Sequence, residues 1–178
     1  MDCIVVDLET TGLKPTWHKI TEIGAVRLRD GLVVDEFHTM VNPMTKIPEH
    51  ITHITGITDA MVADAPKPGE ALRKFLSFAG DDILVAHNAS FDCGFLTHHC
   101  LKHAEMKMNN RVLCTRLLAN KVLPDLHSKK LGVLCKVFNV TNDEAHRALS
   151  DARATAQVLM GLSGLLTAMD KQIEDFVR

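Results

Sequence analysis

The chain opens with three segments in which apolar and polar positions follow the pattern of β-strands. Residues 3–8 (CIVVDL) form a continuous apolar run, which predicts a buried central strand. Residues 20–31 (ITEIGAVRLRDG) alternate in part and end in Asp-Gly, a hairpin signal, and residues 32–41 (LVVDEFHTMV) are rich in β-branched residues. We therefore predict a three-stranded antiparallel meander.

After residue 48 the apolar spacing changes between strand-like and helical segments. Residues 82–88 (DILVAHN) and 111–115 (RVLCT) predict two further buried strands. Helical spacing predicts a short helix within 48–58, helices at 68–80, 89–104, 116–123, 129–138 and 146–169, and a last turn near Val177. This order favours an α/β fold in which one domain, residues 1–178, holds a mixed five-stranded sheet flanked by helices.

The composition is that of a soluble globular chain. Hydrophobic residues make up 46% of the 178 residues and charged residues 24%, and no stretch approaches the roughly 20 apolar residues of a membrane span. The N-terminus carries no basic segment typical of a secretory signal. The five cysteines are odd in number and scattered, so we expect no disulfide framework, a cytoplasmic location and no membrane association.

Charge is distributed unevenly along the chain. Residues 1–101 carry 8 Lys and Arg against 14 Asp and Glu, whereas residues 102–136 carry 8 basic and 2 acidic residues. This asymmetry fits a protein that holds metal ions in one place and phosphates in another. Solvated helix faces would give the same counts.

Two carboxylates, Asp7 and Glu9, end the first predicted strand within the stretch IVVDLETTG. Residues i and i+2 of a strand share a face, so the two acids would repel each other unless a divalent cation lay between them. Thr10, Thr11 and Gly12 then predict a sharp turn that lets a ligand approach the backbone. The alternative is a frayed strand end with both acids in water.

Two further segments repeat this plan. The strand at 82–88 ends in His87 and Asn88, and Asp92 follows in the first turn of the next helix, where an ionised acid is favoured. Asp151 lies near the start of the last long helix, and we expect His146 just before that helix or at its first residue. Taken singly, each of these residues could serve only as a helix cap or a surface group.

Four carboxylates and one histidine at strand ends and a helix start match the needs of two-metal phosphodiester hydrolysis. Two cations stabilise the attacking and leaving oxygens, and a neutral imidazole takes the proton of the attacking water. The five residues are Asp7, Glu9, Asp92, His146 and Asp151.

Three motifs, VVDLETTGL, LVAHNASFDCGFL and HRALSDARAT, resemble those of the DEDDh 3′–5′ exonucleases, a DnaQ-like family. They span residues 5–155. The segment ITGITDAMVADAP (54–66) is similar to the epsilon-type proofreading subunit or domain of bacterial DNA polymerase III. The resemblance implies a ribonuclease H-like fold.

The resemblance also implies roles for the acidic residues. Asp7 would bridge two divalent ions, Mg²⁺ or Mn²⁺, while Glu9 and Asp151 would complete the first ion and Asp92 would act largely through water on the second. His146 would be the general base. Substrate-binding positions implied by the same motifs are Thr10, Thr11, Leu13 (a wedge against the last bases), Ile54, Thr55, His87 and Phe91.

The function that we expect is 3′–5′ exonuclease activity on single-stranded or frayed DNA ends, of the proofreading or repair type, with release of nucleoside 5′-monophosphates. One alternative is an exoribonuclease acting on RNA ends or short oligoribonucleotides. Another is a non-catalytic polymerase accessory module. The epsilon-type subunit usually continues into a polymerase-binding tail, whereas this sequence ends at Arg178. Either the protein works alone, or its tether lies outside this sequence and a DNA polymerase subunit is its partner.

Three other signals carry less weight. His99 and His103 lie four residues apart as in a zinc site, but no Cys/His pair stands elsewhere at a matching spacing. His127 is a second candidate general base outside the three motifs. Lys129 and Lys130 could contact phosphates or simply face solvent.

Overall fold

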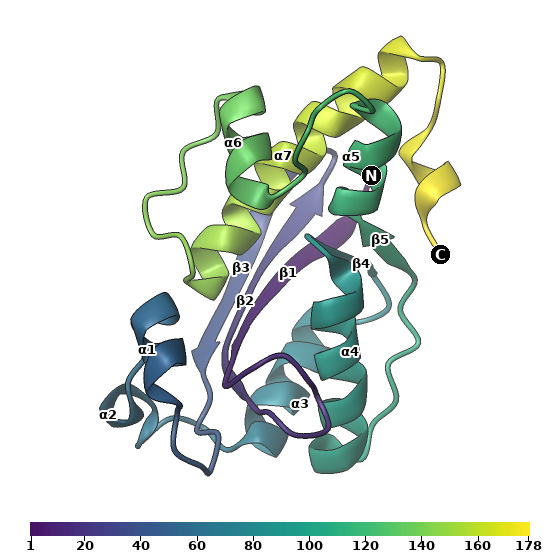
Figure 1. Ribbon diagram of the computed structural model, residues 1–178. Helices are drawn as coiled ribbons and strands as arrows, with labels where there is room; N and C mark the ends of the chain where they lie inside the picture. Colours follow the sequence, from purple (N-terminus) through teal and green to yellow (C-terminus); the bar gives the residue numbers. More distant parts are fainter.

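A five-stranded mixed sheet, in the order β3-β2-β1-β4-β5, forms the centre of the computed structural model, which describes residues 1–178 (Figure 1). β1 pairs antiparallel with β2 and parallel with β4, β2 pairs antiparallel with β3, and β4 pairs parallel with β5. The predicted meander and the two added strands are confirmed. The strands are β1 (Cys3–Thr10), β2 (Ile20–Arg29), β3 (Leu32–Met40), β4 (Ile83–Ala86) and β5 (Val112–Cys114).

Helices cover both faces of the sheet. α5, α6 and α7 lie on one face and α3 and α4 on the other, while α1 and α2 lie beyond one end of the strands (Figure 1). No helix is both long enough and apolar enough to cross a membrane. The helices are α1 (Glu49–Thr55), α2 (Asp59–Val62), α3 (Pro68–Ala79), α4 (Ala89–His99), α5 (Thr115–Val122), α6 (Leu131–Phe138) and α7 (Ala148–Ala168), with a π-helical turn at Cys100–Ala104 and a 3₁₀ turn at Ile173–Phe176.

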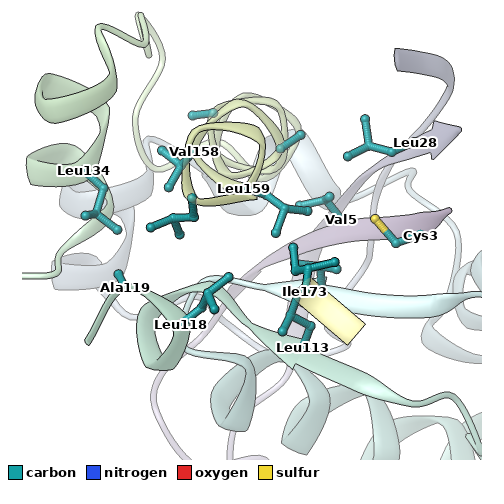
Figure 2. Close-up of a cluster of buried hydrophobic side chains, with 14 of the residues drawn as sticks. Cys3, Val5, Leu28, Leu113, Leu118, Ala119, Leu134, Val158, Leu159 and Ile173 are labelled. Atoms are coloured by element: carbon teal, nitrogen blue, oxygen red, sulfur yellow. The ribbon is translucent and has the colours of Figure 1, made fainter. Parts of the chain in front are cut away.

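Alternation along β1 divides the core into two layers. Val5 points toward α7, where Leu159 lies beside it (Figure 2), and Ile4 points toward α3 on the opposite face, where Phe75 is fully buried. The continuous apolar run at the N-terminus is therefore explained by burial on both faces.

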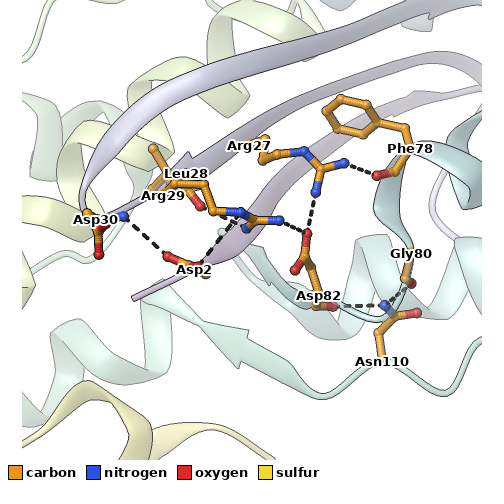
Figure 3. Close-up of polar contacts among 9 residues, drawn as sticks. All are labelled: Asp2, Arg27, Leu28, Arg29, Asp30, Phe78, Gly80, Asp82 and Asn110. Carbon is orange, nitrogen blue, oxygen red and sulfur yellow. Dashed lines mark hydrogen bonds and ion pairs between the residues drawn. The ribbon is translucent and has the colours of Figure 1, made fainter.

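Polar contacts hold the sheet together where β1 and β4 begin (Figure 3). Asp82, just before β4, pairs with Arg27 and with Arg29 (2.6 Å) from β2, and Arg27 also donates to the carbonyl of Phe78. Asn110 donates to the carbonyl of Asp82 (2.8 Å). These contacts lie at the amino end of the parallel strands and leave the carboxyl end free for a site.

Candidate active site

Asp7 and Glu9 lie at the carboxyl end of β1 on the face covered by α7. Asp7 stands opposite Gly24 of β2. A Cβ at Gly24 would lie 2.2 Å from the backbone nitrogen of Leu149, so only glycine lets the first turn of α7 rest on the sheet at this point. The absence of a side chain at Gly24 thus brings α7 beside the two acids.

Asp151 lies in the first turn of α7 and is nearly buried. Its carboxylate accepts hydrogen bonds from the His146 backbone N–H (3.0 Å) and from Asn142 Nδ2 (2.6 Å), and Ser150 Oγ donates to Asn142 Oδ1 (2.8 Å). His146 precedes α7, as the sequence predicted, and its side chain is exposed. Its φ of 66° is in the left-handed region, and the hydrogen bond to Asp151 helps to hold it there.

Glu9, His146 and Asp151 form a group with the spacing of a metal site. One ligand atom from each residue lies within 4.8 Å of those of the other two. The sequence separates Glu9 from Asp151 by most of the chain, and the fold brings them together at the carboxyl end of β1.

Asp92 reaches the same end of β1 from the first turn of α4, on the opposite face of the sheet. The side chain is buried, and its Oδ1 accepts a hydrogen bond from the Leu8 backbone N–H (3.2 Å). Burial raises the pKa of Asp92 to about 8, and the charge of Asp151 acts in the same direction, although the backbone N–H donors lower it in part. An acid in such a place requires either a proton or a cation.

The carboxyl groups of β1 share this property. Burial, followed by the charges of Asp92 and Asp151, raises the pKa of Asp7 well above its ordinary value. Burial also raises the pKa of Glu9 to about 8, with Asp151 the next contribution. A group of carboxylate oxygens that repel one another in this way fits a hard divalent cation, which would replace the retained protons.

Glu22 is a site residue that the sequence analysis missed. It is fully buried, accepts hydrogen bonds from Arg147 (2.8 Å) and from the Ala148 backbone N–H (3.0 Å), and also meets His38 (2.7 Å). Burial alone would raise the pKa of Glu22, but these hydrogen bonds hold it below its ordinary value. Glu22 therefore caps the start of α7 and fixes it to β2.

A signal for Glu22 exists in the sequence. Glu22 and Gly24 share the face of β2 that carries Val26 and Leu28 into the α7 core. An acid on the core-facing side of a strand needs a buried partner. Its partner, Arg147, is 125 residues away and cannot be identified from one sequence.

The three predicted substrate-binding threonines have hydroxyls engaged within the protein. Thr10 lies in β1 rather than in the turn, and its Oγ1 donates to the carbonyl of Gly12 (2.6 Å). Thr11 Oγ1 accepts from the Lys19 N–H (2.9 Å), and Thr55 Oγ1 donates to the Ile51 carbonyl (3.0 Å). In this geometry the three residues shape the surrounding backbone.

The other predicted substrate-binding residues differ in exposure. Leu13 is 79% exposed and Ile54 is 54% exposed, and the loop after β1 and helix α1 both lie at the end of the sheet where β1 ends (Figure 1). His87 follows β4, and its Nδ1 lies 2.9 Å from Thr115 Oγ1. Phe91 packs against Phe95 with ring centroids 4.9 Å apart. Leu13 and Ile54 are therefore the two predicted substrate-binding residues whose side chains are exposed.

The remaining histidines have other surroundings. His127 is exposed in the loop before α6 and is not part of the group at the end of β1. His99 and His103 stack face to face with centroids 5.3 Å apart, and His99 Nε2 lies 3.0 Å from the His18 carbonyl. That arrangement links α4 to the loop after β1.

The comparisons with known proteins agree with this geometry. The family model RNase_T, described as an exonuclease, matches residues 4–159. The PolC-type DNA polymerase III of Clostridium perfringens is 44% identical over 156 residues, covering 88% of this chain and 11% of that protein. The corresponding polymerase of Bacillus subtilis is 40% identical over 172 residues, covering 96% of this chain and 12% of that protein. The chain thus spans only about a tenth of these relatives.

Among solved structures, Exonuclease X in complex with 5′ overhanging duplex DNA is similar over nearly its whole length. The TM-score is 0.78 at 28% sequence identity, and the match covers 98% of this chain and 96% of that one.

Proposed function

The chain belongs to the RNase_T exonuclease family as a DEDDh-type, DnaQ-like member, and from this membership we propose that it is a metal-dependent 3′–5′ exonuclease. The observation that carries the proposal is the close group of Glu9, His146 and Asp151. Two further acids with raised pKa, Asp7 and Asp92, adjoin this group. All five positions carry the side chains that hydrolysis of a phosphodiester requires.

The donor set suits two divalent cations, Mg²⁺ or Mn²⁺. When bound, such ions supply positive charge to the attacking and leaving oxygens of the displaced phosphodiester. The residues that would hold them are Asp7, Glu9, Asp92 and Asp151.

His146 is the general base of the proposed reaction. Its backbone N–H is fixed on Asp151 while its ring is exposed, so the ring is free to accept the proton of an attacking water. The water oxygen bonds to phosphorus, and the bond from phosphorus to the O3′ of the preceding nucleotide breaks. The products are a nucleoside 5′-monophosphate and a strand shortened by one nucleotide, whose O3′ takes up a proton.

DNA is the proposed substrate, in a proofreading or repair role. The support is that the relatives at 40–44% identity are named DNA polymerases and that the similar Exonuclease X structure is described with duplex DNA. Because these relatives are named DNA polymerases, we also propose that the chain associates with a DNA polymerase, which co-purification would test. A comparison of kcat/KM on DNA and RNA oligomers of the same sequence would distinguish a DNA exonuclease from the exoribonuclease alternative.

Labelled single strands test the proposed reaction. With Mg²⁺ or Mn²⁺, a 5′-labelled strand should give a ladder that shortens from its 3′ end, and a 3′-labelled strand should release labelled mononucleotide at once. EDTA should stop both. Internal cleavage, or degradation that continues in EDTA, would exclude the proposed mechanism, and no degradation at all would favour the accessory-module alternative.

A further inference from the structure

We propose that a basic cavity beside the active site binds backbone phosphates of the strand whose 3′ end is being cleaved, upstream of the terminal nucleotide. The proposal rests on the proposed function, since it concerns the same substrate. The cavity has a volume of about 490 Å³ and lies between the end of β4, helix α5 and the start of α6. Arg116, Lys129 and Lys130 line it, together with His127, and no carboxylate does.

The cations of the cavity are only partly engaged within the protein. Arg116 donates to Asn88 Oδ1 (3.1 Å) through one nitrogen, which leaves its other N–H groups available. Lys129 is bound to the carbonyl of Pro124 (3.2 Å) and to that of Leu126, so it also holds the loop in shape. Lys130 lines the cavity; its backbone N–H donates to Ser128 Oγ (3.4 Å), and its ammonium makes no hydrogen bond or ion pair. This arrangement suits a polyanion, for which the protein itself supplies no counter-charge.

The start of α6 adds backbone donors to the same cavity. Lys130 is the N-cap of this eight-residue helix, and no side chain caps it. Leu131, the first residue of the helix, also lines the cavity. Free N–H groups and the helix dipole at this point favour phosphate oxygens, in addition to the three cationic side chains.

The cavity lies close to the candidate active site on the side of His87 and Asn88. Both residues line the cavity, and Asp92 follows them in the first turn of α4. His87 Nε2 is buried without a hydrogen bond of normal geometry, although the main chain of Lys129 lies close to it. Burial lowers the pKa of His87, and the charges of Arg116 and Asp151 act on it in opposite directions. His87 therefore lies between the basic cavity and the carboxylates.

A nucleic-acid strand is the occupant that fits this proximity. A 3′ end held at the carboxylates carries another phosphate at every preceding nucleotide, and those phosphates need a cationic path away from the acids. The basic segment of the chain, residues 102–136, contributes Arg116, Lys129 and Lys130 to that path. Free phosphate or a released mononucleotide offers the same chemistry and is separated from the strand by the experiment.

Lys130→Ala is the cleanest test, because Lys129 also supports the loop and Arg116 also holds Asn88. Arg116→Lys keeps the charge and removes the forked donor. Lys136→Ala is the matched control, since this exposed lysine lies on α6 outside the cavity. Binding of fluorescent single strands two to eight nucleotides long is measured in EDTA at several salt concentrations, and kcat and KM are measured with Mg²⁺.

We expect Lys130→Ala to bind the longer strands roughly tenfold more weakly, with the slope of log K against log salt reduced by about 0.7. Dinucleotide binding and kcat should equal those of the wild type, and KM should rise only for longer strands. Equal affinity and slope at every length would overturn the proposal. So would inorganic phosphate that displaces a long strand at concentrations near the strand's own Kd. If the wild type neither binds nor degrades strands, the proposed function fails, whereas degradation with unchanged variants removes only the cavity.

Discussion

His146 combines a strained backbone with an exposed ring. Its φ of 66° is uncommon for a residue with a side chain, and the Asp151 carboxylate accepts its backbone N–H at 3.0 Å. Strain of this kind is found where a side chain must be held at a reacting group. The position of the imidazole thus depends on the same acid that would help to hold a cation.

His146→Ala tests the assignment of the general base. We expect the rate of mononucleotide release at saturating Mg²⁺ to fall by roughly 10²–10⁴, while Mn²⁺ binding measured by calorimetry is largely retained, because the four carboxylates remain. His127→Ala tests the second candidate base and should keep the wild-type kcat; because His127 lines the basic cavity, only its KM for longer strands should change. A loss that follows His127 instead of His146 would reassign the base.

At the residue scale, the sequence predicts those site residues whose positions are determined by the alternation along a strand or by the start of a helix. Asp7 and Glu9 share a face because they are two residues apart, and Asp151 lies in a first helical turn, as expected. Asn142, which holds Asp151, could not be predicted because its partner is chosen by the fold of the loop before α7. Glu22 could be suspected from its place on the core-facing side of β2, but its partner Arg147, 125 residues away, could not be identified.

At the scale of elements, the site depends on how α7 rests on β2. Gly24 allows the close approach, and Glu22 binds the start of the helix through Arg147 and the Ala148 N–H. His146 directly precedes this fixed point, and Asp151 follows it within the first turn of α7. The geometry of the candidate site is therefore set by a contact between two elements that includes none of the five proposed catalytic residues.

Gly24→Ala should disturb this contact. The added Cβ would lie 2.2 Å from the Leu149 backbone nitrogen. We therefore expect the free energy of unfolding, measured in urea, to fall by about 1–3 kcal/mol and the exonuclease rate to fall by roughly 10²-fold. Gly164→Ala is the matched control, because a Cβ there meets nothing within 4 Å. The control should be as stable as the wild type or up to about 1 kcal/mol more stable. Wild-type activity in Gly24→Ala would show that α7 does not need this approach.

Most elements were predicted close to their observed bounds because their regular spacing of apolar residues extends over a long segment. The helix predicted at 146–169 is α7, Ala148–Ala168, and the helix predicted at 129–138 is α6, Leu131–Phe138. α2 (Asp59–Val62) was not predicted, since four residues are too few to show a helical spacing. Its N-cap is Thr58, whose side chain accepts a hydrogen bond from the Met61 N–H. The π-helical turn after α4 has the same apolar spacing as the helix that it continues.

At the scale of the molecule, the buried acids of the candidate site make folding dependent on pH. Without metal, the folded protein holds protons on Glu9 and Asp92 up to a pKa of about 8, whereas in the unfolded chain these groups ionise near pH 4. Between these values the folded state binds more protons, so its stability is highest below pH 4 for these groups and falls as the pH rises to about 8.

Thermal unfolding with and without Mn²⁺ tests this expectation. In EDTA, the stabilisation that the protonated acids give should decrease from pH 5.5 to pH 8, and Tm should fall with it. Saturating Mn²⁺ should raise Tm by several degrees at pH 8 and by much less at pH 5.5, where protons compete with the ion for the carboxylates. Asp7→Asn should lose most of the Mn²⁺ effect. An equal Mn²⁺ shift at both pH values would mean that the ion binds elsewhere.

The most direct test of the whole account is the rate of mononucleotide release by Asp7→Asn, with circular dichroism to verify the fold. Asp7 lies among the other acids and its amide variant keeps the shape while removing the charge. We predict a fall of at least roughly 10² in the Mg²⁺-dependent rate, and wild-type activity in the control Asp35→Asn on the exposed outer strand β3. Wild-type activity in a folded Asp7→Asn protein would contradict the account.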